Sequence, residues 1–190
     1  MKDSKKNPLP SHLERFLGEI SQGWADPNPH TIQVACFDNQ PRQGITTYVT
    51  LGLSDMVLPM KGGRTIRQEL VTSAHTSLKR KEVAGYLLYC AEQVQQRGYP
   101  LLRGETVNMR YPLIEGATVT GLYATNPTPF EDGFAEFSGA FPSVIFVLMI
   151  PITGNELSLI ADHGWNRFED MLEFQNPDIW DLKRTQEIAL

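Results

Sequence analysis

The run Val144–Ile150 constrains the fold of this chain more than any other segment, because all seven of its residues are apolar. Successive side chains of a β-strand point to opposite faces of the sheet, so an uninterrupted apolar run is typical of a central strand that is covered on both faces. Pro151 follows at once and predicts the end of that strand. The chain should therefore build a sheet with cover on both sides.

Four further segments have the β-branched and aromatic composition of strands. They are Thr31–Asp38, Ile45–Leu51, Arg64–Ala74 and Thr118–Ala124. The first two are separated by a short polar connection and are expected to pair antiparallel.

Helical periodicity marks the beginning and the middle of the chain. Ser11 and Glu14 form a capping-box pattern, with Ser11 as the predicted N-cap of a helix that ends between Gly18 and Gly23. A second helix is predicted over Ser77–Arg97, where a broad apolar stripe indicates cover by a sheet and Gly98 supplies the stop.

The C-terminal part is also predicted to be helical. Thr153 and Glu156 form a second capping box that opens a short helix, and His163-Gly164 breaks it. A further helix should run from Trp165 to Asn176, and the segment 178–184 should form a turn or a short helix anchored by Trp180. Together these patterns predict an α+β fold with a mixed, mostly antiparallel central sheet flanked by helices.

No linker or repeat divides the 190 residues, so one domain is expected over residues 8–190. The Lys-rich segment Met1–Asn7 is not followed by an apolar stretch and is interpreted as a disordered tail rather than a signal peptide. The longest apolar run is too short to span a bilayer, so a cytoplasmic protein with no membrane contact is predicted.

A net charge of −5 argues against nucleic acid as a partner. The one basic cluster, Lys79-Arg80-Lys81, is interpreted as a solvated helix end. The four histidines are not spaced as metal ligands, so neither a metal nor a cofactor is expected: His12, His30, His75 and His163.

Two groups of residues leave an enzyme open as an alternative. Cys36 could serve as a thiol nucleophile, although its apolar surroundings favour a buried free thiol, as for Cys90; a disulfide between the two stays open. Acidic residues in the last third could act as acids or bases, although their spacing is typical of solvated helix faces: Asp162, Glu169, Asp170, Glu173, Asp178 and Asp181. Neither group forms a convincing catalytic constellation, so a non-enzyme is predicted.

Four phenylalanines in the Gly- and Pro-rich middle of the chain allow two interpretations. They either plug an edge of the core or form an exposed binding patch: Phe130, Phe134, Phe137 and Phe141.

Two short signatures carry a family resemblance. The strand Ile45–Leu51 leads into Gly52-Leu53-Ser54-Asp55, and Arg67-Gln68-Glu69-Leu70 follows. Six further segments accompany these signatures: His12-Leu13-Glu14, Leu17-Gly18-Glu19, Pro151-Ile152-Thr153, Glu156-Leu157, Trp165–Glu169 and Asp178–Leu182. In the order and spacing of all these segments, the chain resembles the suppressor-of-fused domain family, in particular its single-domain bacterial branch.

The resemblance implies a mixed α/β fold and a non-catalytic binding role. The animal protein of that name sequesters a transcription factor, and bacterial members are thought to be immunity proteins that neutralise a cognate toxin. We therefore expect a protein partner, possibly a toxin, with an enzyme or a regulatory scaffold for an endogenous partner as alternatives. The oligomeric state is left open.

The partner-binding residues expected from the sequence are Ser54, Asp55, Glu69, Asp178 and Asp181. Ser54 and Asp55 lie in a turn at a strand end, where the backbone is accessible. Asp178 and Asp181 belong to the acidic last third of the chain, which would give an acidic surface that steers a basic partner.

Overall fold

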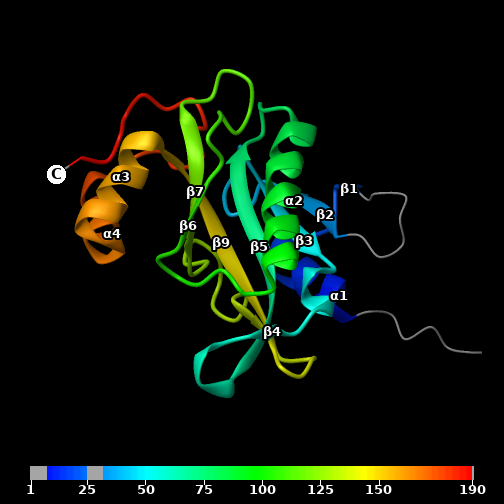
Figure 1. Ribbon diagram of the computed structural model, residues 1–190. Helices are drawn as coiled ribbons and strands as arrows, with labels where there is room; N and C mark the ends of the chain where they lie inside the picture. Colours follow the sequence, from blue (N-terminus) through cyan, green and yellow to red (C-terminus); the bar gives the residue numbers. More distant parts are fainter. Residues whose placement is uncertain (1–7, 25–31, 190) are drawn as a thin grey trace, which may run out of the picture.

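A computed structural model describes residues 8–24 and 32–189, so the predicted N-terminal tail over residues 1–7 lies outside the described part. The fold is α+β, as predicted, with a mixed, mostly antiparallel sheet and flanking helices (Figure 1). The strands are β1 (Gln22–Trp24), β2 (Gln33–Asp38), β3 (Ile45–Leu51), β4 (Leu58–Pro59), β5 (Thr65–His75), β6 (Thr106–Asn108), β7 (Val119–Thr125), β8 (Glu136–Phe137) and β9 (Val144–Thr153).

The described strands follow the order β1-β2-β3-β5-β9-β7-β6, with β4 paired to β5 and β8 paired to β9. β2 and β3 are antiparallel, which confirms the predicted hairpin. The pairing of β5 with β9 is parallel and makes the sheet mixed.

β9 is central, as its apolar run predicts, because it pairs with β5 on one edge and with β8 and β7 on the other. The prediction that Pro151 ends this strand is wrong, since β9 continues to Thr153 and Pro151 pairs with Leu122. β5 accompanies β9 only as far as Leu148. Pro151 therefore lies where β9 has a neighbour on one edge, and its missing N–H costs no bond to β5.

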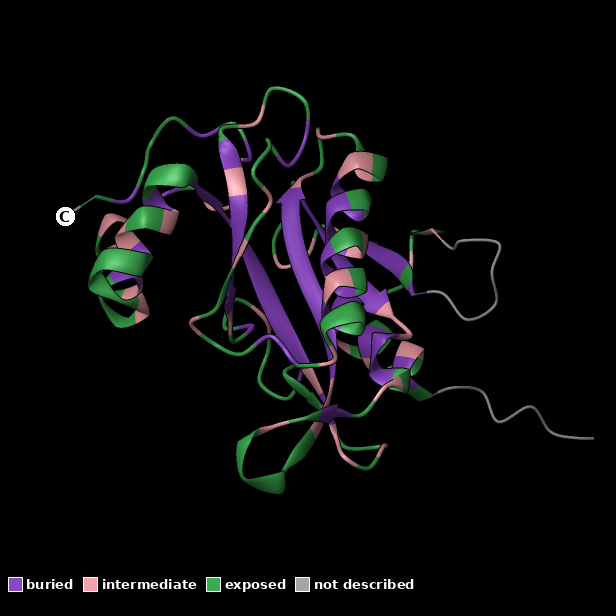
Figure 2. Ribbon diagram, in the orientation of Figure 1, coloured by how far each residue is buried: buried purple, intermediate pink, exposed green. Residues whose placement is uncertain are grey.

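Both faces of the sheet are covered, and the strands are the most continuously buried part of the ribbon (Figure 2). α2 (Arg80–Arg97) lies on one face, where its Val83, Leu87 and Val94 pack into a core with Leu70 and Leu122. α1 (Pro8–Leu17), α3 (Gly154–His163) and α4 (Trp165–Gln175) bury residues in a second core on the other face, including Leu13, Ile160 and Phe168.

The predicted stop of α2 and the predicted start of α3 are confirmed, but the predicted start of α1 is not, and α2 begins at Arg80 rather than at Ser77. Gly98 ends α2 in the left-handed conformation, at φ 70°, and Thr153 and Glu156 form the reciprocal capping box of α3. The prediction that Ser11 is the N-cap of the first helix is wrong, because α1 begins at Pro8 and Ser11 lies inside it. A proline fits the first turn of a helix, where the N–H groups have no intrahelical partner.

The four phenylalanines of the middle segment divide between the two interpretations. Phe134 is fully buried against the second core, and Phe130 and Phe137 pack on it partly buried. Phe141 is 95% exposed.

The segment after α4, described as far as residue 189, contains no helix or strand. Its Trp180, Leu182 and Ile188 are nevertheless buried. A buried ion pair joins Arg184 of this segment to Glu156 of α3 at 2.5 Å. Within the described ranges, no helix has the length and apolar character needed to cross a bilayer.

Candidate functional site: the β6 edge and the α2 groove

β6 forms one edge of the sheet, and among the described residues it pairs with β7 alone. Backbone hydrogen bonds from Met109 N to Thr120 O, at 2.9 Å, and from Ala124 N to Glu105 O, at 2.8 Å, show which positions face β7. Because bonding alternates along an antiparallel pair, the carbonyl of Glu105 and the backbone groups of Val107 and Met109 point to β7, whereas the N–H of Glu105 donates to Leu102 O. The N–H and C=O of Thr106 and Asn108 therefore face outward.

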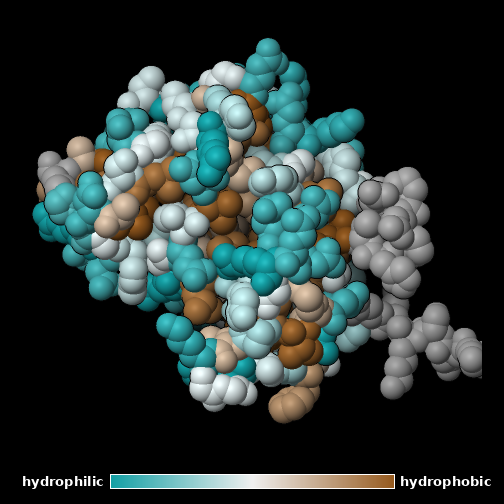
Figure 3. Space-filling model, viewed as in Figure 1, coloured by the Kyte–Doolittle hydropathy of each residue, from teal (hydrophilic) through white to brown (hydrophobic). Residues whose placement is uncertain are grey.

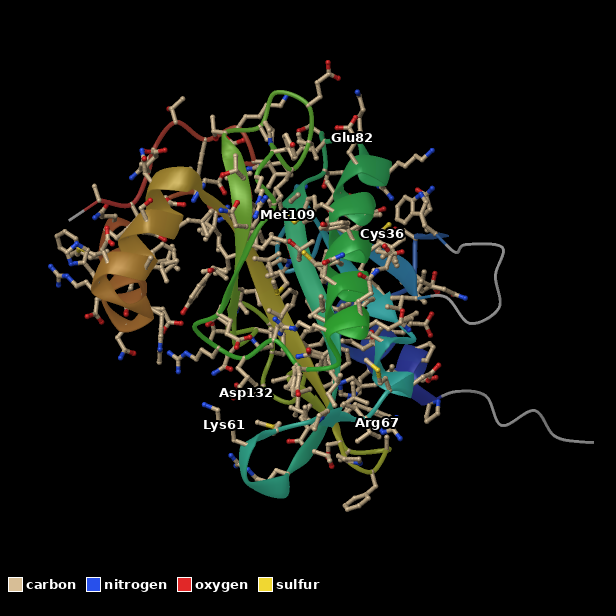
Figure 4. The ribbon with its side chains drawn as sticks, viewed as in Figure 1. Cys36, Lys61, Arg67, Glu82, Met109 and Asp132 are labelled. Carbon is tan, nitrogen blue, oxygen red and sulfur yellow. The ribbon has the colours of Figure 1, made fainter. Side chains whose placement is uncertain are left out.

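The side chains of β6 alternate between two faces of the sheet. Val107 packs against the core under α2, and Met109 follows it over the sheet, between α2 and β7 (Figure 4). Thr106 and Asn108 are exposed. They line a cavity of about 630 Å³ together with Leu157 and Ser158 of α3.

A second cavity, of about 300 Å³, lies between β6 and α2 and is called the α2 groove below. It is lined by Tyr89, Val94 and Leu101 among others. Around it, large side chains remain accessible, with Tyr89 47%, Tyr99 63% and Leu102 40% exposed. Apolar groups reach the surface in the middle of this face of the molecule (Figure 3). Exposed aromatic and aliphatic groups beside an unpaired strand edge suit a protein partner in an extended conformation.

The residues expected to bind a partner are not gathered here. Glu69 is fully buried in β5, and its carboxylate accepts four hydrogen bonds, from Thr50 Oγ1 (2.6 Å), Gly52 N (3.0 Å), Ser54 N (3.0 Å) and Ser54 Oγ (2.6 Å). The two sequence signatures are thus in direct contact, and Glu69 holds the turn that follows β3. Burial raises the pKa of Glu69 to about 7, against the opposing effect of the hydrogen bonds from Ser54, Thr50 and Gly52.

Arg67 completes this clamp from the same strand, near β4 at one end of the sheet (Figure 4). Its guanidinium donates to the carbonyl oxygens of Ser54, at 2.6 Å, and Asp55, at 3.0 Å. Ser54 is 7% exposed, so in this structure neither Ser54 nor Glu69 presents its side chain to solvent, whereas Asp55 is exposed. A contact of Asp55 with a partner stays a prediction.

Asp178 lies at the opposite end of β5. Its carboxylate is 2.8 Å from His75 Nε2 and 3.8 Å from Arg42, and it lines a cavity of about 520 Å³. His75 lies six positions beyond Glu69 along β5, which is roughly 20 Å in a strand. Asp181 accepts a hydrogen bond from the backbone N–H of Lys183 at 2.9 Å. The expected residues therefore form two separate groups.

Cys36, the thiol considered for catalysis, is fully buried beside α2, with Ser21 Oγ 3.2 Å and Arg80 3.6 Å from its Sγ (Figure 4). No histidine is among its hydrogen-bond partners in residues 8–24 and 32–189. Cys36 and Cys90 are both free thiols, which answers the question of a disulfide.

The basic cluster at the start of α2 is occupied by intramolecular pairs. Arg80 binds Asp38 at 2.7 Å, and Lys79 binds Glu82 at 2.9 Å and Glu115 at 3.6 Å. Two of the three cations at this helix end, Lys79 and Arg80, are thus paired with acidic neighbours.

Comparisons with known proteins agree with this architecture. The chain is 25% identical over 168 residues to the immunity protein YqcF of Bacillus subtilis (strain 168), covering 87% of this chain and 86% of that protein. The crystal structure of a suppressor-of-fused homologue from Neisseria gonorrhoeae FA 1090 superposes with a TM-score of 0.76 at 19% identity, covering 95% and 94% of the two chains.

Two further solved structures share the fold at lower identity. A chain of the Sufu–Fu complex gives a TM-score of 0.71 at 13% identity, with 95% of this chain and 90% of that chain covered. Drosophila Suppressor of Fused gives 0.64 at 15% identity, and the match covers 82% of this chain but 42% of that chain. Residues 28–185 match the family described as suppressor of fused protein, and the chain therefore belongs to this family.

Proposed function

We propose that this chain is a non-catalytic protein-binding domain that acts as an immunity protein, binding and neutralising a cognate toxin. The similarity to the immunity protein YqcF carries this proposal, because it extends over 87% of this chain and 86% of that protein. An immunity protein needs a rigid scaffold and a complementary surface rather than a reactive group. The two hydrophobic cores, one on each face of the sheet, supply such a scaffold.

The surface that best fits this role is the outer edge of β6 with the groove toward α2. An extended segment of the partner would pair with the outward N–H and C=O groups of Thr106 and Asn108, and its side chains would enter the cavities on either side of β6. Tyr89 is the proposed aromatic anchor, since it lines the α2 cavity and is 47% exposed.

The exposed carboxylates have a secondary role in the proposal. Asp55 and Asp178 are accessible, and the protein has a net charge of −5. Such a surface accelerates encounter with a basic partner more than it strengthens the complex. The two free thiols fit action in the reducing cytoplasm.

Co-expression tests the proposal. The product of a toxin gene adjacent to the gene for this chain is expressed alone, with this chain, or with an unrelated immunity protein as control. We expect this chain to restore growth and to co-purify with the toxin. Absence of both rescue and binding with every linked toxin would contradict the proposed function.

A further inference from the structure

The segment that leads into β6 is held by contacts from other elements. At its start, the fully buried Gln68 of β5 makes two hydrogen bonds to the backbone of Leu101, from its Nε2 to Leu101 O at 3.0 Å and from Leu101 N to its Oε1 at 2.9 Å. At its end, Gly104 N donates to Ala124 O at 2.9 Å. Between these two points lies Arg103.

Arg103 is fixed by α4, on the other side of the sheet edge. Its guanidinium binds the Glu169 carboxylate with two nitrogens, Nε at 3.1 Å and Nη2, and lies 4.9 Å from the Trp165 ring centre. Gly104 sits against the same ring: a Cβ at this position, where φ is +94°, would be 2.6 Å from Trp165 Cδ1. The contact thus requires both the arginine and the glycine.

Glu169 is itself anchored to β7, the neighbour of β6. Tyr123 Oη and Thr125 Oγ1 donate to its Oε1 at 2.7 and 2.9 Å. Partial burial favours the neutral form, but hydrogen bonds from Arg103, Tyr123 and Thr125 outweigh it and lower the pKa of Glu169. The charged carboxylate of Glu169 therefore connects α4 both to β7 and to the segment before β6.

We infer that Arg103 and Glu169 are positioning residues for partner binding, because they hold the three-residue strand β6 in the geometry that a partner strand must meet. This inference rests on the proposed function. A strand of three residues has few ladder bonds of its own, so contacts before it decide how well it is ordered. Because the edge strand is already ordered before binding, the complex forms with a smaller loss of conformational entropy.

Hydrogen exchange tests the inference without a partner. Arg103→Ala should accelerate exchange of the Gly104 and Met109 amides, which bond to Ala124 O and Thr120 O, about ten-fold, while α2 amides and the urea midpoint keep their wild-type values. Arg103→Lys should give an intermediate rate, because lysine keeps the charge but loses the fork and the stacking. Arg167→Ala, an exposed arginine on the same helix α4, is the matched control and should leave the rates unchanged.

Binding of the toxin from the co-expression experiment supplies the functional readout. Arg103→Ala should dissociate about ten-fold faster than wild type, with Arg103→Lys between them and Arg167→Ala equal to wild type. Wild-type exchange and dissociation rates in Arg103→Ala would overturn the inference. Failure of the wild-type chain to bind any linked toxin would instead overturn the proposed function, and the exchange rates would still decide whether Arg103 orders β6.

Discussion

Ser54 donates both its backbone N–H and its hydroxyl to one carboxylate oxygen of Glu69, at 3.0 and 2.6 Å. This contact joins the two sequence signatures through which the chain resembles its family. The carboxylate lies in the core with no ion-pair partner among the described residues. The signatures therefore hold the turn at the end of β3 in place.

Replacement of Glu69 by glutamine should destabilise the protein by about 2–4 kcal/mol. Glutamine keeps an oxygen for the three donors of the turn on Oε1, but its amide nitrogen at the Oε2 position cannot accept from Thr50 Oγ1, so this buried hydroxyl loses its carboxylate partner. The free energy of unfolding from urea titration measures the effect. Asp55→Asn, in the same turn but exposed, is the control and should change stability by less than about 0.5 kcal/mol.

Stability should also depend on pH through Glu69. Its pKa is raised to about 7 in the folded protein, from an ordinary value of 4.5, so the folded state holds the proton more tightly than the unfolded state. The resulting stabilisation is complete below about pH 4.5 and is lost as the pH rises to about 7; it amounts to up to roughly 3 kcal/mol. Urea titrations between pH 5 and pH 8 should show this decline in the free energy of unfolding of the wild type. The same decline in Glu69→Gln would show that another group causes it.

Removal of the arginine from the buried pair Arg184–Glu156 should cost about 3–5 kcal/mol. The side chains are 4% and 0% exposed, and Arg184→Ala would leave the Glu156 carboxylate buried without its counter-ion. Thermal or urea unfolding measures the loss. The neighbouring exposed Lys183 provides the control, since Lys183→Ala should leave stability within about 0.5 kcal/mol of wild type.

Tyr89→Ala should weaken toxin binding by about 2 kcal/mol, or roughly thirty-fold, if the aromatic ring anchors the partner in the α2 groove. Calorimetric titration gives the affinity. Phe174→Ala removes another highly exposed aromatic ring, 82% exposed on α4, and should have little effect. Equal losses in the two variants would argue against a specific anchor.

The parts of the fold that the sequence predicted are those with a strong local signal. The apolar run of β9, the stripe of α2 and the Thr153–Glu156 capping box each identify an element within a single window. The start of α1 was mispredicted because Ser11 offers a good cap, while Pro8 satisfies the helix start three residues earlier.

The candidate site was not predictable in the same way. β6 has three residues, too few for a period, and its edge position depends on the strand order of the whole sheet. Glu69 is among the residues expected to bind a partner, yet it is fully buried, which is rare for a glutamate without an ion-pair partner. The donors that make its burial tolerable come from residues 50–54, and their contact with Glu69 depends on the pairing of β3 with β5.

The central claim, that a partner pairs with the β6 edge, is tested most directly by the affinity of Thr106→Pro for the toxin. Proline removes the outward N–H of residue 106 and leaves the bonds to β7 intact, whereas Thr106→Ala keeps that N–H and removes the side chain. We expect Thr106→Pro to bind at least about ten-fold more weakly than wild type, at equal stability, and Thr106→Ala to bind within about three-fold. Wild-type affinity in Thr106→Pro would contradict strand pairing at β6.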